Sequence, residues 1–92
     1  MGDIENFGHY VNQLGDKVYP ADITEFISCH KILSKSQMSW GDLELLRTYI
    51  KYFRDVVRTQ QKYIENQESR KIVERGIELL EDIVKPLSHK IN

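Results

Sequence analysis

Hydrophobic residues recur along this chain at spacings of three and four, which is the period of amphipathic α-helices. The pattern predicts helices at about residues 3–14, 22–34, 39–66 and 69–85. No segment alternates apolar and polar residues as a half-buried strand does. We therefore predict an all-α fold in which residues 1–92 form a single four-helix bundle-like domain with one long central helix.

Capping signals support two of these helix starts. Asp22 is followed by Glu25 three residues later, and Ser39 is followed by Asp42 at the same spacing. This spacing is typical of a capping box, in which the first side chain accepts a hydrogen bond from a backbone N–H of the first turn. Because no Gly or Pro interrupts residues 42–66, we expect the third helix to be continuous over that range. We favour a break at residues 66–69, and the alternative is that the third helix continues into the fourth, since no Gly or Pro forces an interruption there.

The third helix has the strongest periodicity in the chain. Its first apolar row follows the heptad rhythm of coiled coils and consists of Leu43, Leu46, Ile50, Phe53, Val57, Gln60 and Ile64. A second row lies beside it and consists of Leu45, Tyr49, Tyr52, Val56 and Tyr63. The apolar arc is therefore wider than the ~100° stripe that a surface helix buries.

The length of this helix points to self-association. About 26 residues would form a rod roughly 39 Å long, whereas a compact chain of this size is roughly 32 Å across. We therefore expect a homodimer with the first apolar row as the dimer seam, in which the polar Gln60 sets the register. The alternative is a monomer in which the other helices of the chain cover both rows.

Composition and charge restrict the possible partners. The chain has 13 Lys and Arg against 14 Asp and Glu, so no net field attracts nucleic acid or an anionic membrane. The longest apolar runs are two residues, so we expect neither a membrane span nor an export signal. A single cysteine, Cys29, allows no internal disulfide and fits a cytoplasmic protein.

One local cluster departs from this neutral balance. Five cations lie within an arc of about 80° on the third helix, away from the apolar rows, and they are Arg47, Lys51, Arg54, Arg58 and Lys62. Such a ridge could bind a partner protein or follow the phosphates of duplex RNA, which proteins recognise by shape. Because acidic residues lie on or beside the same arc, a solvated face is the simplest interpretation. Met38 and Trp40, just before the ridge, are candidate anchors for a partner.

The chain carries no recognisable catalytic or metal-binding motif. It lacks a nucleophile elbow, a glycine-rich phosphate loop and a close cluster of Cys and His residues, so we predict no enzyme activity, cofactor or metal. Residues 29–36, CHKILSKS, resemble the phosphoacceptor segment of histidine phosphotransfer domains, which are four-helix bundles. That resemblance implies phosphorylation of His30. In that family a lysine and a glycine follow three and four residues after the histidine, where Leu33 and Ser34 stand here.

These observations favour a small non-catalytic regulator or adaptor that acts as a homodimer and binds a partner protein. The first alternative is a dimer that binds duplex RNA through the cationic ridge, independently of sequence. The second alternative is a module for histidine phosphotransfer.

Overall fold

The computed structural model describes residues 2–89, which form five helices and no strand. The helices are α1 Asp3–Asn12, α2 Pro20–Leu33, α3 Trp40–Thr59, α4 Gln61–Glu65 and α5 Gln67–Leu87. The all-helical prediction is thus confirmed over the described residues. Within that part of the chain, no helix is both long and apolar enough to cross a lipid bilayer.

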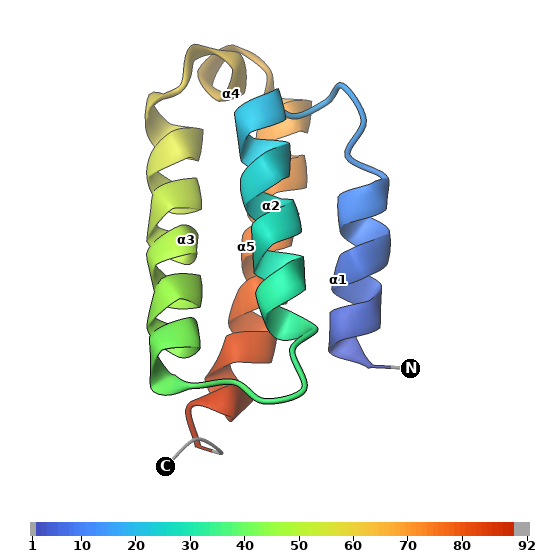
Figure 1. Cartoon of the computed structure of the whole chain (residues 1–92). Helices are drawn as coiled ribbons and strands as arrows, with labels where there is room; N and C mark the ends of the chain where they lie inside the picture. Colours follow the sequence, from blue (N-terminus) through green and yellow to red (C-terminus); the bar gives the residue numbers. More distant parts are fainter. Residues whose placement is uncertain (1, 90–92) are drawn as a thin grey trace.

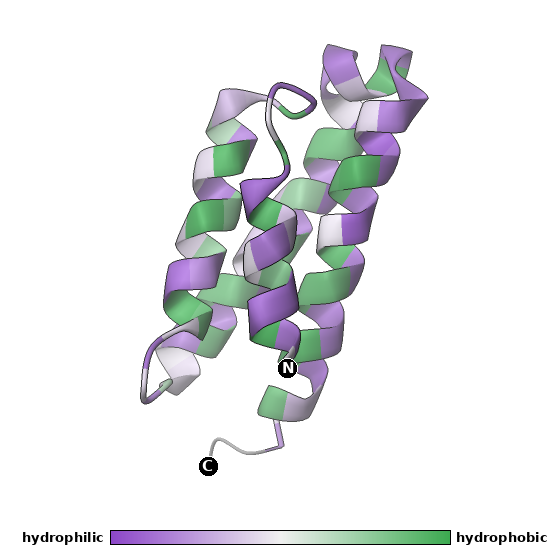
Figure 2. Ribbon diagram, turned by 90° about the vertical axis from the view of Figure 1, so that its right-hand side faces the viewer, coloured by the Kyte–Doolittle hydropathy of each residue, from purple (hydrophilic) through white to green (hydrophobic). Residues whose placement is uncertain are grey.

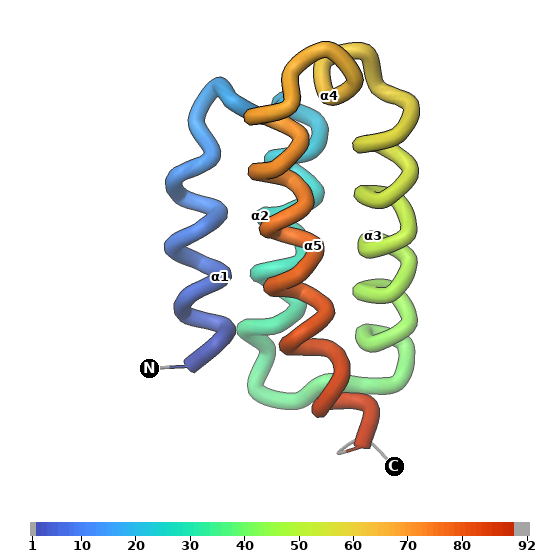
Figure 3. Tube along the Cα trace, turned by 180° about the vertical axis from the view of Figure 1, so that it is seen from behind, coloured from blue at the N-terminus to red at the C-terminus, as the bar shows by residue number. Residues whose placement is uncertain are grey.

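The four longer helices run alternately in opposite directions. In Figure 1, α1 and α3 lie at opposite sides of the molecule, with α2 between them in front and α5 between them behind, as the reverse view in Figure 3 also shows. The short α4 closes the end of the molecule where the chain passes from α3 to α5. The described chain is elongated along the helices, with extents of 42 × 24 × 18 Å.

The expected long central helix is not present, because the predicted segment at residues 39–66 is divided at Gln60. There the backbone is extended, with φ −80° and ψ 129°, and it ends α3 and begins α4. With 20 residues, α3 is about 30 Å long, which is shorter than the molecule itself. The helix therefore does not overhang, and the length argument for a dimer fails.

The first apolar row of α3, predicted as a dimer seam, lies in the core of its own chain. Its first five members are all buried: Leu43, Leu46, Ile50, Phe53 and Val57. α2 and α5 pack against α3 and cover this row. The last two members leave the row at the break, where Gln60 is exposed and the Ile64 side chain is 51% exposed. The five buried members offer almost no free surface to a second copy, so the structure gives the predicted seam no support.

Aromatic rings fill the centre of the core. The rings of Phe26 and Phe53 stack with centroids 3.9 Å apart, and those of Phe7 and Tyr10 pack around Phe26. Figure 2 shows the corresponding pattern, in which bands of hydrophobic and hydrophilic residues alternate along the helices. Burial of these large apolar surfaces supplies the main driving force for folding.

Gly76 allows α1 and α5 to approach closely. A Cβ atom at this position would lie 2.5 Å from the Tyr10 hydroxyl oxygen and 2.7 Å from Cε1 of Phe26. That hydroxyl also donates a hydrogen bond of 2.6 Å to the carbonyl oxygen of Ile72, which ties α1 to α5. Burial raises the pKa of Tyr10, because the phenolate would lose its hydration.

The helix termini agree only in part with the capping signals. Ser39 and Asp42 form the predicted capping box at the start of α3. A hydrogen bond from Lys35 and one from the backbone N–H of Ser39 hold the pKa of Asp42 below its usual value. By contrast, Asp22 does not cap the second helix, which begins at Pro20 after Tyr19 as N-cap.

The C-terminal helix extends beyond its predicted ends. Asn66 caps α5 by accepting hydrogen bonds from the N–H groups of Glu68 and Ser69, so the helix begins at Gln67. It includes Pro86 and ends one residue later. The predicted interruption before residue 69 is therefore present and slightly earlier than expected.

Candidate functional site

Four of the five cations of the predicted ridge lie together on one side of α3. We call them the cationic row, and they are Arg47, Lys51, Arg54 and Arg58. Lys62 does not belong to it, because the break at Gln60 turns this residue away. Its ammonium group instead donates to the carbonyl oxygen of Asp16 at 3.0 Å and lies 5.1 Å from the ring centroid of Tyr19.

The cationic row borders a groove between α3 and α5. Two hollows of about 580 and 590 Å³ follow one another along this groove. Ile50 and Val84 line the first hollow, and Val57 and Ile77 line the second, each being almost completely buried. The groove therefore has a narrow apolar floor between two polar rims.

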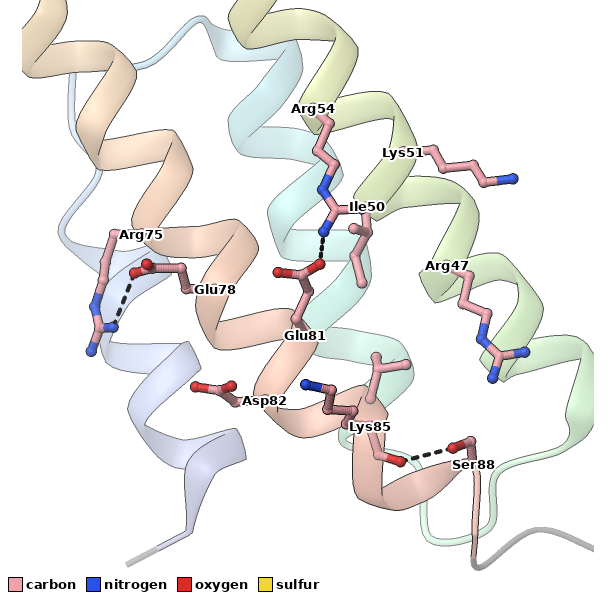
Figure 4. A pocket seen from close by; sticks show the side chains of 11 residues that line it. Arg47, Ile50, Lys51, Arg54, Arg75, Glu78, Glu81, Asp82, Lys85 and Ser88 are labelled. Carbon is pink, nitrogen blue, oxygen red and sulfur yellow. Dashed lines mark hydrogen bonds and ion pairs between the residues drawn. The ribbon is translucent and has the colours of Figure 1, made fainter.

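The opposite rim carries three glutamates of α5. We call Glu74, Glu78 and Glu81 the acidic row; all three line the same two hollows as the cations. An ion pair between Arg54 and Glu81 joins the rims, as Figure 4 shows for the first hollow. Arg54 also lines the second hollow. The α5 rim is mixed in charge, because Arg70, Arg75, Asp82 and Lys85 also line these hollows. The charged lining residues of α3 are all positive, whereas those of α5 carry both signs.

Most other charge pairs near the groove stay within one helix. They are Glu44–Arg47, Asp55–Arg58, Arg70–Glu74 and Arg75–Glu78, all three or four residues apart. Exposed pairs of this kind contribute only about 0.3–0.5 kcal/mol each. These side chains can therefore exchange their partners at small cost when another molecule approaches.

Trp40 extends the cationic row at its N-terminal end. It is the first residue of α3 and lies seven residues before Arg47, two turns away on the same side of the helix. Its side chain is 46% exposed. The second candidate anchor, Met38, is half-buried and packs against the core. Of the two candidates, Trp40 is the more accessible to a partner.

The second apolar row of α3 is divided between core and surface. Val56 and Tyr63 are buried, and Tyr49 is half-buried. Leu45 and Tyr52 remain exposed on the side of α3 away from the cationic row. The wide apolar arc is thus largely covered by the chain itself.

Cys29 and His30 are both packed against other parts of the chain. Cys29 is fully buried, and burial, reinforced by the negative charge of Glu25, raises its pKa to about 12. The thiol is therefore protonated at neutral pH and a poor nucleophile. His30 is half-buried beside the ring of Phe7 and next to Gly8, where an added Cβ would lie 2.8 Å from its Nε2. This packing gives no support to phosphotransfer by His30.

A buried cluster around Asp22 was not anticipated from the sequence. The Tyr52 hydroxyl donates to Oδ1 of Asp22 at 2.8 Å, and the Tyr63 hydroxyl donates to Oδ2 at 2.9 Å. Tyr63 also accepts a hydrogen bond from the N–H of Tyr19, and the Tyr19 hydroxyl accepts one from the N–H of Lys62. The cluster thereby ties the α1–α2 connection, α2, α3 and α4 together.

The Asp22 cluster has a structural role. Burial, followed by the hydrogen bond to Asp22, raises the pKa of Tyr52 to about 12, so its hydroxyl is a hydrogen-bond donor at neutral pH. The hollows of the α3–α5 groove are lined by other residues. The signal for this cluster in the sequence was Asp22 itself, which stands among apolar residues at the start of a helix.

The described residues contain no group of three or more His, Cys, Asp or Glu side chains placed to hold a metal ion. Comparisons with protein-family models, with curated proteins and with solved structures gave no match. The groove between α3 and α5, with the cationic row on one rim and Trp40 at its end, is therefore the candidate functional site.

Proposed function

We propose that this protein is a non-catalytic protein-interaction module that binds an acidic segment of a partner protein along the cationic row. The uniformly positive lining of the α3 rim is the observation that carries this proposal. Tryptophan and arginine are the residue types most enriched among energetically dominant interface positions. Both occur together on the exposed side of α3.

The acidic row favours a protein partner over duplex RNA. An RNA duplex presents its phosphates on both sides of the shallow groove that proteins contact. A duplex wide enough to span α3 and α5 would meet the mixed charge of the α5 rim, where Glu74, Glu78 and Glu81 repel phosphates and only part of the contacts is attractive. An α-helix, about 10–12 Å across with its side chains, can place acidic residues on the cations without this repulsion. A protein segment therefore fits the charge pattern better.

The proposal needs no second copy of the chain. The apolar row that would have formed a dimer seam is covered by α2 and α5. A monomer therefore already presents the whole groove. The shallow floor and exposed rims favour reversible binding, with charge setting specificity and association rate more than affinity.

Site-specific photo-cross-linking in cells that express the protein tests this function. A photoreactive amino acid replaces Lys51 on the cationic row or, as a control, Lys31 on the exposed side of α2. The expected result is a protein adduct specific to position 51. The purified partner should then bind the Arg47→Glu/Lys51→Glu variant at least tenfold more weakly than the wild type. Lys31→Glu/Lys71→Glu has the same net charge change and should bind normally.

A nuclease-sensitive adduct at position 51 would instead support RNA binding. Affinity for duplex RNA would then fall steeply with salt, and Arg54→Ala/Arg58→Ala would reduce the slope of log K against log salt by about two. That result, or equal cross-linking at positions 51 and 31, would refute the proposed function.

A further inference from the structure

A third hollow, separate from the α3–α5 groove, lies between α1 and α5. It has a volume of about 400 Å³ and is lined by residues from the end of α1, from the connection to α2 and from the first half of α5. Figure 3 shows α1 and α5 side by side. The chain therefore has a second recess, on the other side of α5, whose residues the proposed function leaves almost entirely unused.

Positive charge predominates in this third hollow. Lys17 lines it from the connection after α1, Lys71 and Arg75 line it from α5, and Glu68 is the one acid of the lining. The net charge of the lining residues is therefore +2. Within residues 2–89, neither lysine forms an ion pair, and Glu68 forms none either. Two ammonium groups from different segments thus lack a carboxylate partner in the chain itself.

The other two charged residues of the lining leave this positive charge largely intact. Glu68 lies in the first turn of α5, where the helix dipole favours an acid, so the stability of the helix accounts for its position. Arg75 pairs with Glu78 at 3.4 Å, but both side chains are more than 60% exposed and belong to one helix. Because such a pair is weak, Arg75 can turn towards a ligand in the hollow. Three cations are therefore available to one anion.

The walls of the third hollow are held in place by contacts within the chain. The Tyr10 hydroxyl on the α1 side donates its hydrogen bond of 2.6 Å to the carbonyl oxygen of Ile72 on the α5 side, and both residues line the hollow. Leu14, a third lining residue, is 2% exposed and belongs to the core. A fixed frame reduces the entropy lost on binding. A volume of about 400 Å³ lies near the lower end of small-molecule pockets, so the ligand should be small.

We infer that this hollow binds a small molecule with two negative charges, either a phosphate monoester or a dicarboxylate. The net charge of +2 on the lining matches a dianion, and a monoanion would leave one positive charge unmatched. Ammonium and guanidinium groups are the side chains that form the strongest hydrogen bonds to phosphate and carboxylate oxygens. The exposed amide of Gln13 supplies a further donor. The inference is independent of the proposed function, because the third hollow and the groove share only Arg75.

Titrations of the whole chain followed by NMR of the backbone amides test this site. Methyl phosphate and succinate are the dianionic probes at pH 8, and methyl sulfate is a monoanion of the same shape as methyl phosphate. At constant ionic strength we expect at least one dianion to cause saturable shifts at residues 13–17 and 68–75. The dissociation constant should be roughly 1 mM, because exposed charges bind weakly. Methyl sulfate should bind at least fivefold more weakly. Binding of methyl phosphate alone would identify a phosphate ligand, and binding of succinate alone would identify a dicarboxylate.

Charge variants locate the bound anion. Lys17→Gln/Lys71→Gln should weaken its binding at least tenfold. The control Lys31→Gln/Lys51→Gln, which has the same net charge change, should leave the shifts at residues 13–17 and 68–75 unaltered. Glu68→Gln should strengthen binding at least twofold, because it removes the like charge from the hollow. All five side chains are exposed, so the variants should fold normally, and circular dichroism checks this.

Several results would overturn the inference. If neither dianion binds, or if the shifts rise linearly and are as large along the cationic row, the hollow does not select an anion. Equal binding of methyl sulfate and the dianions would refute the match of charge. Normal binding in the folded Lys17→Gln/Lys71→Gln variant would show that these lysines do not form the site. None of these results concerns the binding of a partner protein by the cationic row.

Discussion

Removing one hydroxyl group from the Asp22 cluster should destabilise the fold by an amount that depends on its burial. Tyr63 is 0% exposed, and its hydroxyl both accepts from the N–H of Tyr19 and donates to Asp22. Tyr52 donates to the other oxygen of the same carboxylate but is 38% exposed. Replacing either tyrosine by phenylalanine keeps the ring and removes only the hydroxyl, so the two variants form a matched pair.

The structure predicts a clear difference between the two variants. A hydrogen bond to a charged group contributes about 1.5–3 kcal/mol, and a buried group left without a partner costs about 1–3 kcal/mol. Tyr63→Phe removes such a bond and leaves the Tyr19 N–H without its acceptor, so we expect a loss of about 2–4 kcal/mol. For Tyr52→Phe we expect a smaller loss of about 1–2 kcal/mol, because only one hydrogen bond is removed and no backbone N–H loses its acceptor.

Urea unfolding followed by circular dichroism at pH 7 and 25 °C measures both losses. A domain of this size has a total stability of roughly 5–10 kcal/mol, so the loss in Tyr63→Phe should shift the midpoint strongly. Asp22→Ala should cost at least as much as Tyr63→Phe, because it removes the shared acceptor. If Tyr63→Phe costs no more than Tyr52→Phe, the cluster does not secure α4 as described.

Three further predictions concern packing, pH and assembly. Gly76→Ala should destabilise the fold by about 1–2 kcal/mol in urea unfolding, although alanine has the better helix propensity. Gly8→Ala should be nearly neutral or stabilising, because the atoms that its Cβ would meet belong to the movable end of the His30 side chain. Equal effects of the two substitutions would contradict the close approach of α1 and α5 at Gly76. Burial raises the pKa of Cys29 in the folded state, so above pH 9 the unfolded chain loses this proton more readily than the folded chain. The contribution of Cys29 to the free energy of unfolding is therefore complete below pH 9 and decreases as the pH rises towards 12. The urea midpoint should therefore fall more between pH 8 and pH 11 in the wild type than in Cys29→Ala, and identical slopes would refute this. Sedimentation should show the wild type as a monomer at tens of micromolar, and Ile50→Asp should unfold that monomer. If the wild type is instead a dimer and this substitution dissociates it, the hypothesis of a dimer seam on α3 is restored.

Local sequence signals predicted the helical class and the start of α3. The spacing of Ser39 and Asp42 was sufficient, because both partners of a capping box lie within one turn. Asp22 and Glu25 have the same spacing, yet Asp22 is instead drawn into the core by tyrosines from distant parts of the chain. The apolar neighbours of Asp22 indicate burial, but a local pattern cannot identify hydrogen-bond donors that lie 30 and 41 residues away.

The break at Gln60 was unpredictable for the same reason. No Gly or Pro marks it, and the heptad rhythm continues through it. In a continuous helix Tyr63 would lie five turns beyond Leu45 on the same, exposed side. The break instead buries the Tyr63 ring and joins its hydroxyl to Asp22 and Tyr19. Tertiary hydrogen bonds thus override the helix propensity of this segment, and they also remove Lys62 from the cationic row.

The charged rims of the α3–α5 groove, by contrast, were accessible from the sequence. The glutamates at positions 74, 78 and 81 repeat at helical spacing, as do the cations of the preceding helix. Helices that follow each other with a short connection usually pack side by side and antiparallel. Applying this rule to α3 and α5 would have placed acids opposite bases and reduced the expectation of phosphate binding. Each row considered by itself resembles a solvated face, and only their position on the two sides of one groove makes the cationic row a candidate for protein binding and not for phosphate binding alone.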